Sequence, residues 1–158
     1  QYNFFLLSTA ELKELIPNEL MLKSGGIFAR VNIPSGTKYG PFNGKWETQP
    51  LDRRFAWEVC VRCWLDGTTD KTNWLKIVRS TNFPQDVNVY TNISYFQIWY
   101  QVSRDVPSGQ ELLLGPRTPL PLQDVFAAGG KLTVWYSSNF RTNTSDYKKI
   151  AKLLPNHL

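Results

Sequence analysis

The stretch RFAWEVCVRCWL, residues 54–65, decides the fold class of this 158-residue chain. Its apolar residues recur at every second position from Phe55 to Leu65, and the positions between them are mixed in character. A period of two is typical of a β-strand with one buried face. We therefore predict one strand over residues 54–65 in a mainly β protein.

The same period bears on Cys60 and Cys63, the two cysteines of the chain. Side chains three positions apart on one strand point to opposite faces of the sheet. On such a strand the two sulfurs could neither share a metal ion nor form a disulfide easily. We predict a buried Cys63 and a more exposed Cys60, and we expect neither a zinc nor a redox centre here.

Outward from this stretch, the chain alternates extended segments with turns between two terminal helices. Ser8-Thr9-Ala10-Glu11 has the spacing of a helix capping box, and Pro17 would end that helix. A short helix is expected over residues 72–80 and a basic C-terminal helix over 146–154. The further extended segments that we expect are 20–22, 27–33, 37–39, 95–102, 111–114 and 131–136.

Composition disfavours most common catalytic machinery. His157, the single histidine, lies at the end of the chain, where a general base is hard to hold in place. With the two cysteines it makes three candidate zinc ligands, whereas a structural zinc site needs four. No apolar stretch reaches 18 residues, so we expect no membrane-spanning helix. Because the chain begins at Gln1, we expect it to be part of a longer protein.

Two other functional classes stay open as alternatives. The net charge of +5 allows a basic nucleic-acid-binding domain, although the lysines and arginines are scattered rather than clustered. The sequons that begin at Asn92 and Asn143 would indicate a secreted β-sandwich if they are glycosylated.

Three motifs occur in an order that resembles the PR domains, the SET-related modules of zinc-finger transcription regulators. They are residues 38–45 (KYGPFNGK), 73–79 (NWLKIVR) and 106–113 (VPSGQELL), with Asn88-Val89 and Ile98-Trp99-Tyr100 between the last two. The resemblance spans about residues 19–115. It implies a SET-like fold of several small, mainly antiparallel sheets with short helices. The chain would then be a single PR-like domain, residues 1–158, with 116–158 as an extension of the matching core.

Two departures from the family pattern bear on activity. SET methyltransferases bind S-adenosylmethionine partly through an Asn-His motif, and this chain has Arg79-Ser80 at that position. Their strand also continues from Glu-Leu-Leu to an aromatic residue and a tyrosine, whereas Leu114-Gly115-Pro116 follows in this chain. The resemblance therefore implies no catalytic, cofactor-binding or metal-binding residues. In the alternative, a protein-lysine methyltransferase, residues 115–131 would be an insertion and Tyr136 would be the catalytic tyrosine.

Residues 40–45 (GPFNGK), preceded by 19–22 (ELML), are most similar to the PR domains of Friend-of-GATA proteins, which are multi-zinc-finger cofactors of GATA factors. The resemblance implies a non-enzymatic interaction or structural module of a nuclear transcriptional corepressor, with zinc only in neighbouring fingers. Its expected partners are transcription factors and chromatin corepressors, reached through the full-length protein. The candidate contact surfaces are the proline-rich loop 115–121 and the side chains of Tyr95, Trp99, Trp135 and Arg117.

Overall fold

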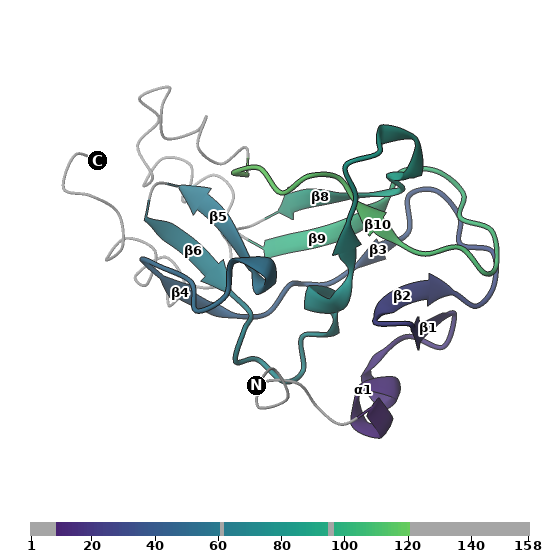
Figure 1. The fold of residues 1–158 in the computed structure, drawn as a ribbon, viewed down its shortest axis with the longest axis horizontal. Coiled ribbons are helices and arrows are strands. Elements are labelled where there is room, and N and C mark those ends of the chain that lie inside the picture. Colours follow the sequence, from purple (N-terminus) through teal and green to yellow (C-terminus); the bar gives the residue numbers. More distant parts are fainter. Residues whose placement is uncertain (1–8, 61, 95–96, 121–158) are drawn as a thin grey trace.

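A computed structural model describes residues 9–60, 62–94 and 97–120 and confirms the mainly β fold (Figure 1). Three small sheets have the strand orders β1-β2, β3-β9-β8-β10-β7 and β4-β6-β5. The predicted N-terminal helix is α1, whereas the predicted strand 131–136 and helix 146–154 lie outside the described residues. In chain order, the elements are α1 (Thr9–Leu15), β1 (Leu20–Lys23), β2 (Gly26–Ala29), β3 (Lys38–Tyr39), β4 (Lys45–Glu47), η2 (Arg53–Phe55), β5 (Ala56–Cys60), β6 (Cys63–Asp66), η3 (Trp74–Ile77), β7 (Arg79–Ser80), η4 (Pro84–Asp86), β8 (Val89–Ser94), β9 (Gln97–Val102) and β10 (Leu113–Leu114).

The prediction of one strand over residues 54–65 is wrong, because this stretch is the antiparallel hairpin of β5 and β6. The backbone partner of Cys60 is Cys63, whereas Trp57 pairs with Leu65. A β-bulge between Glu58 and Cys60 shifts the register by one residue. The shift puts odd-numbered residues on the core side of both strands, so the period of two continues through the turn. Cys63 is buried as expected, but the argument from a continuous strand does not apply to the two cysteines.

The sheets are mainly antiparallel as expected, with parallel pairing of β10 to both β7 and β8 in the central sheet. One other expectation needs correction. The region predicted as one helix over 72–80 is the 3₁₀ helix η3 followed by β7. Strand β8 extends well beyond the Asn88-Val89 pair, and its alternation was obscured by polar residues such as Asn92.

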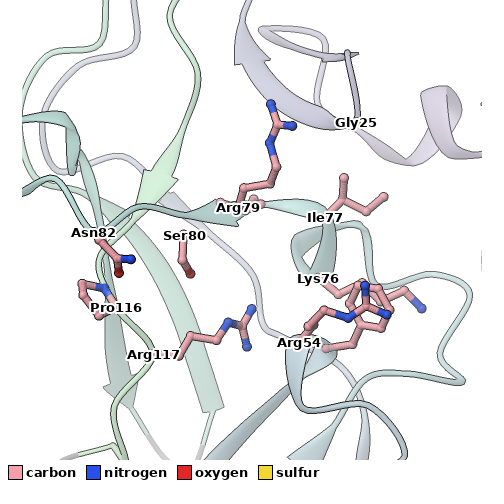
Figure 2. A pocket seen from close by; sticks show the side chains of 11 residues that line it. Gly25, Arg54, Lys76, Ile77, Arg79, Ser80, Asn82, Pro116 and Arg117 are labelled. Atoms are coloured by element: carbon pink, nitrogen blue, oxygen red, sulfur yellow. The ribbon is translucent and has the colours of Figure 1, made fainter.

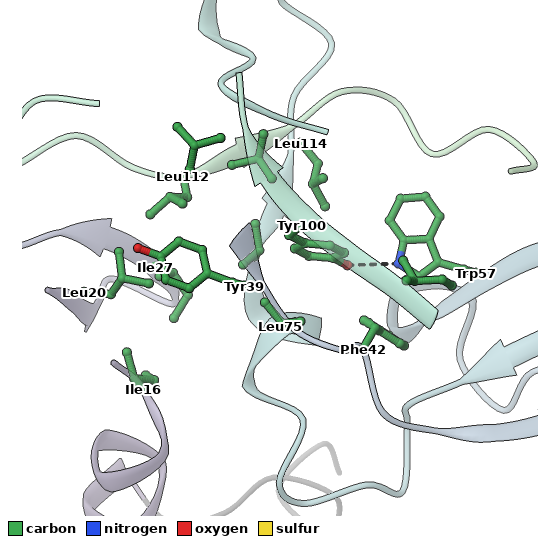
Figure 3. Packing of buried hydrophobic residues seen from close by; sticks show 14 of the residues in the cluster. Ile16, Leu20, Ile27, Tyr39, Phe42, Trp57, Leu75, Tyr100, Leu112 and Leu114 are labelled. Atoms are coloured by element: carbon green, nitrogen blue, oxygen red, sulfur yellow. Dashed lines mark hydrogen bonds between the residues drawn. The ribbon is translucent and has the colours of Figure 1, made fainter. Parts of the chain in front are cut away.

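A buried hydrogen bond joins the β4-β6-β5 sheet to the central sheet. Trp57 Nε1 donates to the hydroxyl oxygen of Tyr100 over 2.9 Å (Figure 3), and both side chains are almost completely buried. The two rings meet edge to face with centroids 6.1 Å apart, and Phe42 packs on the other side of Tyr100. Strands β5 and β9 are therefore fixed to each other by aromatic packing and one polar contact.

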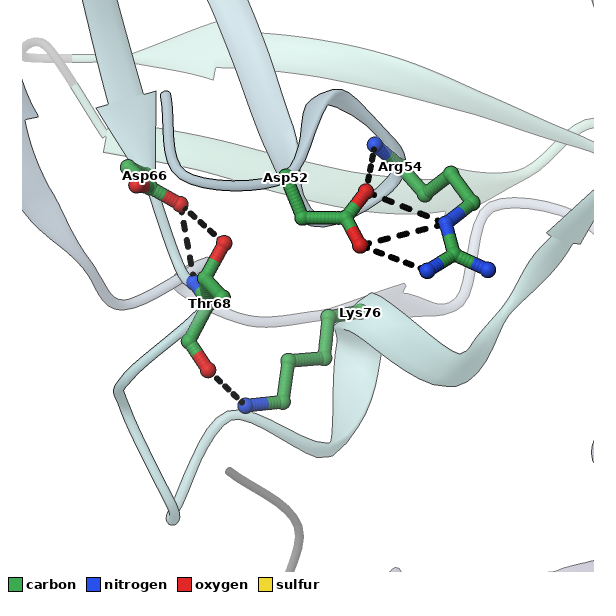
Figure 4. A network of polar contacts seen from close by, with 5 residues as sticks. All are labelled: Asp52, Arg54, Asp66, Thr68 and Lys76. Atoms are coloured by element: carbon green, nitrogen blue, oxygen red, sulfur yellow. Dashed lines mark hydrogen bonds and ion pairs between the residues drawn. The ribbon is translucent and has the colours of Figure 1, made fainter. Parts of the chain in front are cut away.

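The first two family motifs meet at the loop over residues 66–70. Asn73 Nδ2 donates to the carbonyl of Asn43, and Gly44 lies so close to the Asp66 carbonyl that no Cβ would fit there. The ammonium of Lys76, which is 3% exposed, donates to the Gly67, Thr68 and Asp70 carbonyls at 2.7–3.1 Å. Figure 4 shows the Lys76 ammonium directed at the Thr68 carbonyl of this loop. Contact through one loop explains why the motifs occur together despite their separation in sequence.

We expect Tyr100→Phe to change how stability depends on pH. Burial raises the pKa of Tyr100 to about 12, whereas the phenol of an unfolded chain ionises near 10. The unfolded state therefore loses its proton first, and stability falls as the pH rises from 10 to 12, by up to about 1.4 kcal/mol per pH unit. Urea unfolding across this range should show a shallower fall in Tyr100→Phe.

Exposed Tyr90 on β8 supplies the matched control, since Tyr90→Phe should keep the slope of the unmodified chain. At neutral pH, Tyr100→Phe should cost about 1–3 kcal/mol, because the buried Trp57 N–H loses its acceptor. Equal slopes for the two variants would contradict the assignment.

We expect Lys76→Met to lower the free energy of unfolding by about 1–3 kcal/mol, because the loop carbonyls lose their donor while the side-chain volume is kept. Urea unfolding at pH 7 measures the change. Lys71→Met, at an exposed position beside the same loop, should stay within about 0.5 kcal/mol. A Lys76→Met variant as stable as Lys71→Met would show that the ammonium does not hold the loop.

Candidate functional site

A cleft of about 670 Å³ opens between η2, η3, β7 and the segment that follows β10 (Figure 2). Its volume lies within the usual range for sites that hold a small molecule or a few side chains. We call it the cationic cleft. Its lining residues are Gly25, Arg54, Phe55, Lys76, Ile77, Val78, Arg79, Ser80, Asn82, Pro116 and Arg117.

Among the described residues that line the cleft, four are charged, and all four are cationic, namely Arg54, Lys76, Arg79 and Arg117. Lys76 directs its ammonium to the loop carbonyls described above, and burial lowers its pKa, against the opposing effect of the nearby carboxylates Asp70 and Asp66. The three guanidinium groups therefore set the electrostatic character of the cleft.

Two of these guanidinium groups form ion pairs with carboxylates from outside the lining. Arg54 pairs with Asp52 at 2.6 Å, and hydrogen bonding to Arg54 lowers the pKa of Asp52. Arg79 pairs with Glu111 at 2.6 Å, and this hydrogen bond raises the pKa of Arg79. Both arginine side chains stay about half exposed, so they can interact with a ligand as well.

Arg117 is held by packing rather than by an ion pair. Its guanidinium carbon lies 4.3 Å from the centroid of the Trp57 ring, and Nη1 donates to the Ala56 carbonyl over 2.8 Å. Among the described residues, no carboxylate lies within ion-pair distance of it. Figure 2 shows this side chain extending from the segment after β10 toward the side of the cleft that carries Arg54. A planar cation is thus oriented before any ligand arrives.

Apolar surface lies next to these cations. Phe55 and Ile77 are half-buried and Pro116 is exposed, and all three line the cleft. The site therefore combines guanidinium donors with hydrocarbon, which suits a ligand that is both anionic and apolar.

The two departures from the family pattern meet in this cleft. Strand β10 pairs in parallel with β7, so that Leu114 lies opposite Ser80, and Thr81 N donates to the Leu114 carbonyl over 2.8 Å. Arg79-Ser80, which the resemblance compares with the Asn-His motif, therefore lies beside Pro116, which it compares with the family's tyrosine. The two departures, which lie far apart in the sequence, therefore line the same cleft.

The lining does not fit S-adenosylmethionine well. S-adenosylmethionine carries a sulfonium and an ammonium group besides one carboxylate, so its net charge is positive, whereas the charged side chains of the described lining are all cationic. None of the tyrosines in the described part of the chain lines the cleft. Tyr39 donates to Glu19, and burial raises its pKa, whereas the buried Tyr100 hydroxyl accepts from Trp57.

The structure separates the four predicted partner-contact residues. Arg117 lies in the cleft, whereas Trp99 is half-buried on β9, where its ring covers Gly40 and leaves no room for a Cβ. Trp99 does not line the cleft, and Tyr95 and Trp135 lie outside the described residues, as does Tyr136 of the methyltransferase alternative.

Arg54, Lys76 and Arg79 were not predicted as site residues, although Arg79-Ser80 was noted as a departure from the family pattern. Lys76 and Arg79 belong to one motif, and the fold brings them together with Arg54 and Arg117. The available signal was Arg79 itself, because a cation stands there at the position of a cofactor motif.

In the described ranges, no three His, Cys, Asp or Glu side chains are grouped so that they could hold a metal ion. The same part of the chain contains no helix long and apolar enough to cross a membrane.

Known proteins with similar sequences and structures support the fold described above. Residues 15–118 match the family model of the PR domain of PR domain zinc finger protein 2. The methyltransferase domain of human PR domain-containing protein 2 superposes with a TM-score of 0.57 at 24% identity, over 71% of this chain and 86% of that domain. At this identity the superposition shows the shared fold alone.

Two curated relatives are histone-lysine N-methyltransferases by name. Set-17 of Caenorhabditis elegans is 27% identical over 140 residues, which cover 80% of this chain and 43% of set-17. MECOM of Mus musculus is 30% identical over 112 residues, which cover 63% of this chain and 9% of MECOM. The chain thus spans less than half the length of either relative. Because the family match covers more than half of this chain and the fold agrees with it, the chain belongs to the PR-domain family of SET-related domains.

Proposed function

We propose that this PR domain transfers no methyl groups and acts as a protein-interaction module in transcription regulation. The observation that carries the proposal is the cationic cleft, where Arg79-Ser80 and Pro116 lie together at the positions of the family's cofactor and tyrosine motifs. Methyl transfer requires an oriented, dehydrated nucleophile next to the sulfonium. The described lining supplies cations where that reaction needs electron-rich groups.

The second candidate function is protein-lysine methyl transfer. It is favoured by the names of set-17 and MECOM and by the fold shared with a methyltransferase domain. Tyr136 is the residue that it would require from the C-terminal segment. The two candidates make opposite predictions for cofactor binding.

Calorimetric titration of the 158-residue chain with S-adenosylmethionine should give no binding heat, because the sulfonium would be placed among guanidinium groups. Incubation with labelled cofactor and histones should transfer no label. The methyltransferase domain of human PR domain-containing protein 2 serves as the positive control in both assays.

Saturable heat with micromolar affinity, or label on histones, would overturn the proposal. If label transfer were also lost in Tyr136→Phe, the second candidate function would be supported directly.

We further propose a biological context for this domain. The similarity of residues 40–45 and 19–22 to Friend-of-GATA PR domains supports a nuclear corepressor of GATA factors, with zinc held only in neighbouring fingers. In this context, direct partners are transcription factors and corepressor proteins rather than nucleic acid. Co-precipitation of the full-length protein with GATA factors from nuclear extract tests this context separately from the cofactor assays, and failure to co-precipitate would contradict the GATA assignment.

A further inference from the structure

We propose that the cationic cleft binds an acidic, partly apolar peptide segment of a partner protein, with carboxylates at Arg117 and Arg79 and an apolar side chain between them. This inference rests on the proposed function, because it identifies the surface through which the domain would act as an interaction module.

The cationic cleft carries the positive charge that an acidic peptide would need. Arg54, Arg79 and Arg117 all line the cleft, and its described lining contains no carboxylate. In Figure 2 the Arg117 side chain extends toward Arg54, whereas that of Arg79 extends toward Gly25. Arginine recognises carboxylates through paired N–H donors. Positive potential in a cleft attracts anionic groups and raises their rate of association.

Two of the arginine side chains are held in place before a ligand binds. Arg117 is already stacked on Trp57 and bonded to the Ala56 carbonyl, so little side-chain freedom is lost when its remaining N–H groups meet a ligand. Arg79 is likewise held by Glu111 and by the Ser24 carbonyl, which its Nη1 reaches over 3.1 Å. Both donors are thus positioned by contacts within the domain rather than by the ligand.

The lining also suits a peptide better than nucleic acid. Phosphates of nucleic acid bind along an extended basic stripe, and bases stack on open aromatic faces. Among the described residues that line the cleft, only Phe55 carries an aromatic ring, and the Arg54 guanidinium lies over it with 5.3 Å between its central carbon and the ring centroid. The surface suited to stacking is therefore covered.

The charge of the cleft suits a carboxylate better than a phosphate group. Asp52 and Glu111 lie behind Arg54 and Arg79, and they offset part of the positive charge that a dianionic phosphate needs. A single carboxylate meets less of this repulsion. Half-buried Ile77 and exposed Pro116 offer hydrocarbon beside it for an apolar side chain.

Fluorescence anisotropy on the 158-residue chain tests the proposal. The probe is a fluorescein-labelled synthetic peptide in which Asp and Glu residues flank a Leu-Phe pair. Three comparison probes replace the acids with Asn and Gln, replace Leu-Phe with Ser-Ser, or consist of a single-stranded oligonucleotide. We expect the acidic, apolar probe to bind most tightly, with an affinity that falls as salt rises.

Arg117→Gln and Arg79→Gln should each weaken binding about tenfold, whereas Arg30→Gln, at an exposed position that does not line the cleft, should leave it unchanged. Thermal unfolding of each variant shows whether it still folds, and the use of two cleft variants keeps the test valid if one of them does not.

Three results would overturn the inference. They are the absence of binding by the acidic probe, equal binding of the neutral probe, and cleft variants that bind as well as Arg30→Gln. Tight binding of the oligonucleotide alone would assign the cleft to nucleic acid instead. A failed peptide test with blank calorimetry overturns only this inference, whereas displacement of the bound probe by S-adenosylmethionine would overturn the proposed function and leave the peptide site standing.

Discussion

The hydrogen bond from Trp57 to Tyr100 is the contact on which the arrangement of the sheets and the cleft depends. It is completely enclosed, so neither group can exchange its partner for water, and the cost of losing one partner exceeds the usual net value of about 1 kcal/mol. The same indole presents a ring face to the Arg117 guanidinium. A core contact therefore also fixes the orientation of a cation at the surface, and the geometry of the site is determined by packing within the domain.

The fold could be predicted from sequence where local pattern and tertiary contact agree. Alternation over 97–102 reports a real strand, since Ile98, Tyr100 and Val102 are all buried. The hairpin of β5 and β6 was missed because its β-bulge keeps the odd-numbered residues inward on both strands, which removes the change of phase that would mark a turn. Parallel pairing of β10 with β7 and β8 could not be predicted either, because strands of two residues carry too little pattern to indicate a partner.

The site was only partly predictable for a related reason. The motif comparison singled out Arg79-Ser80 and Gly115-Pro116, but nothing in the sequence indicates that the two positions are neighbours. That proximity follows from the pairing of β7 with β10. Arg117 was selected as a partner contact and does lie on the cleft, whereas Trp99 was selected for its aromatic character and instead covers the Gly40 backbone. Residue type alone does not distinguish an aromatic ring that packs from one that binds.

The charge of the cleft links the two proposals through one physical argument. A site for a sulfonium needs partial negative charge near the reacting carbon, and a site for a carboxylate needs the opposite. The same three guanidinium groups that are unfavourable for the first ligand are favourable for the second. Because Arg54 and Arg79 keep their own carboxylates, the folded domain avoids the full repulsion among these cations, while Arg117 retains its charge for a partner. An anionic ligand would therefore find its strongest single interaction at Arg117, the cation that is anchored to the Trp57–Tyr100 pair.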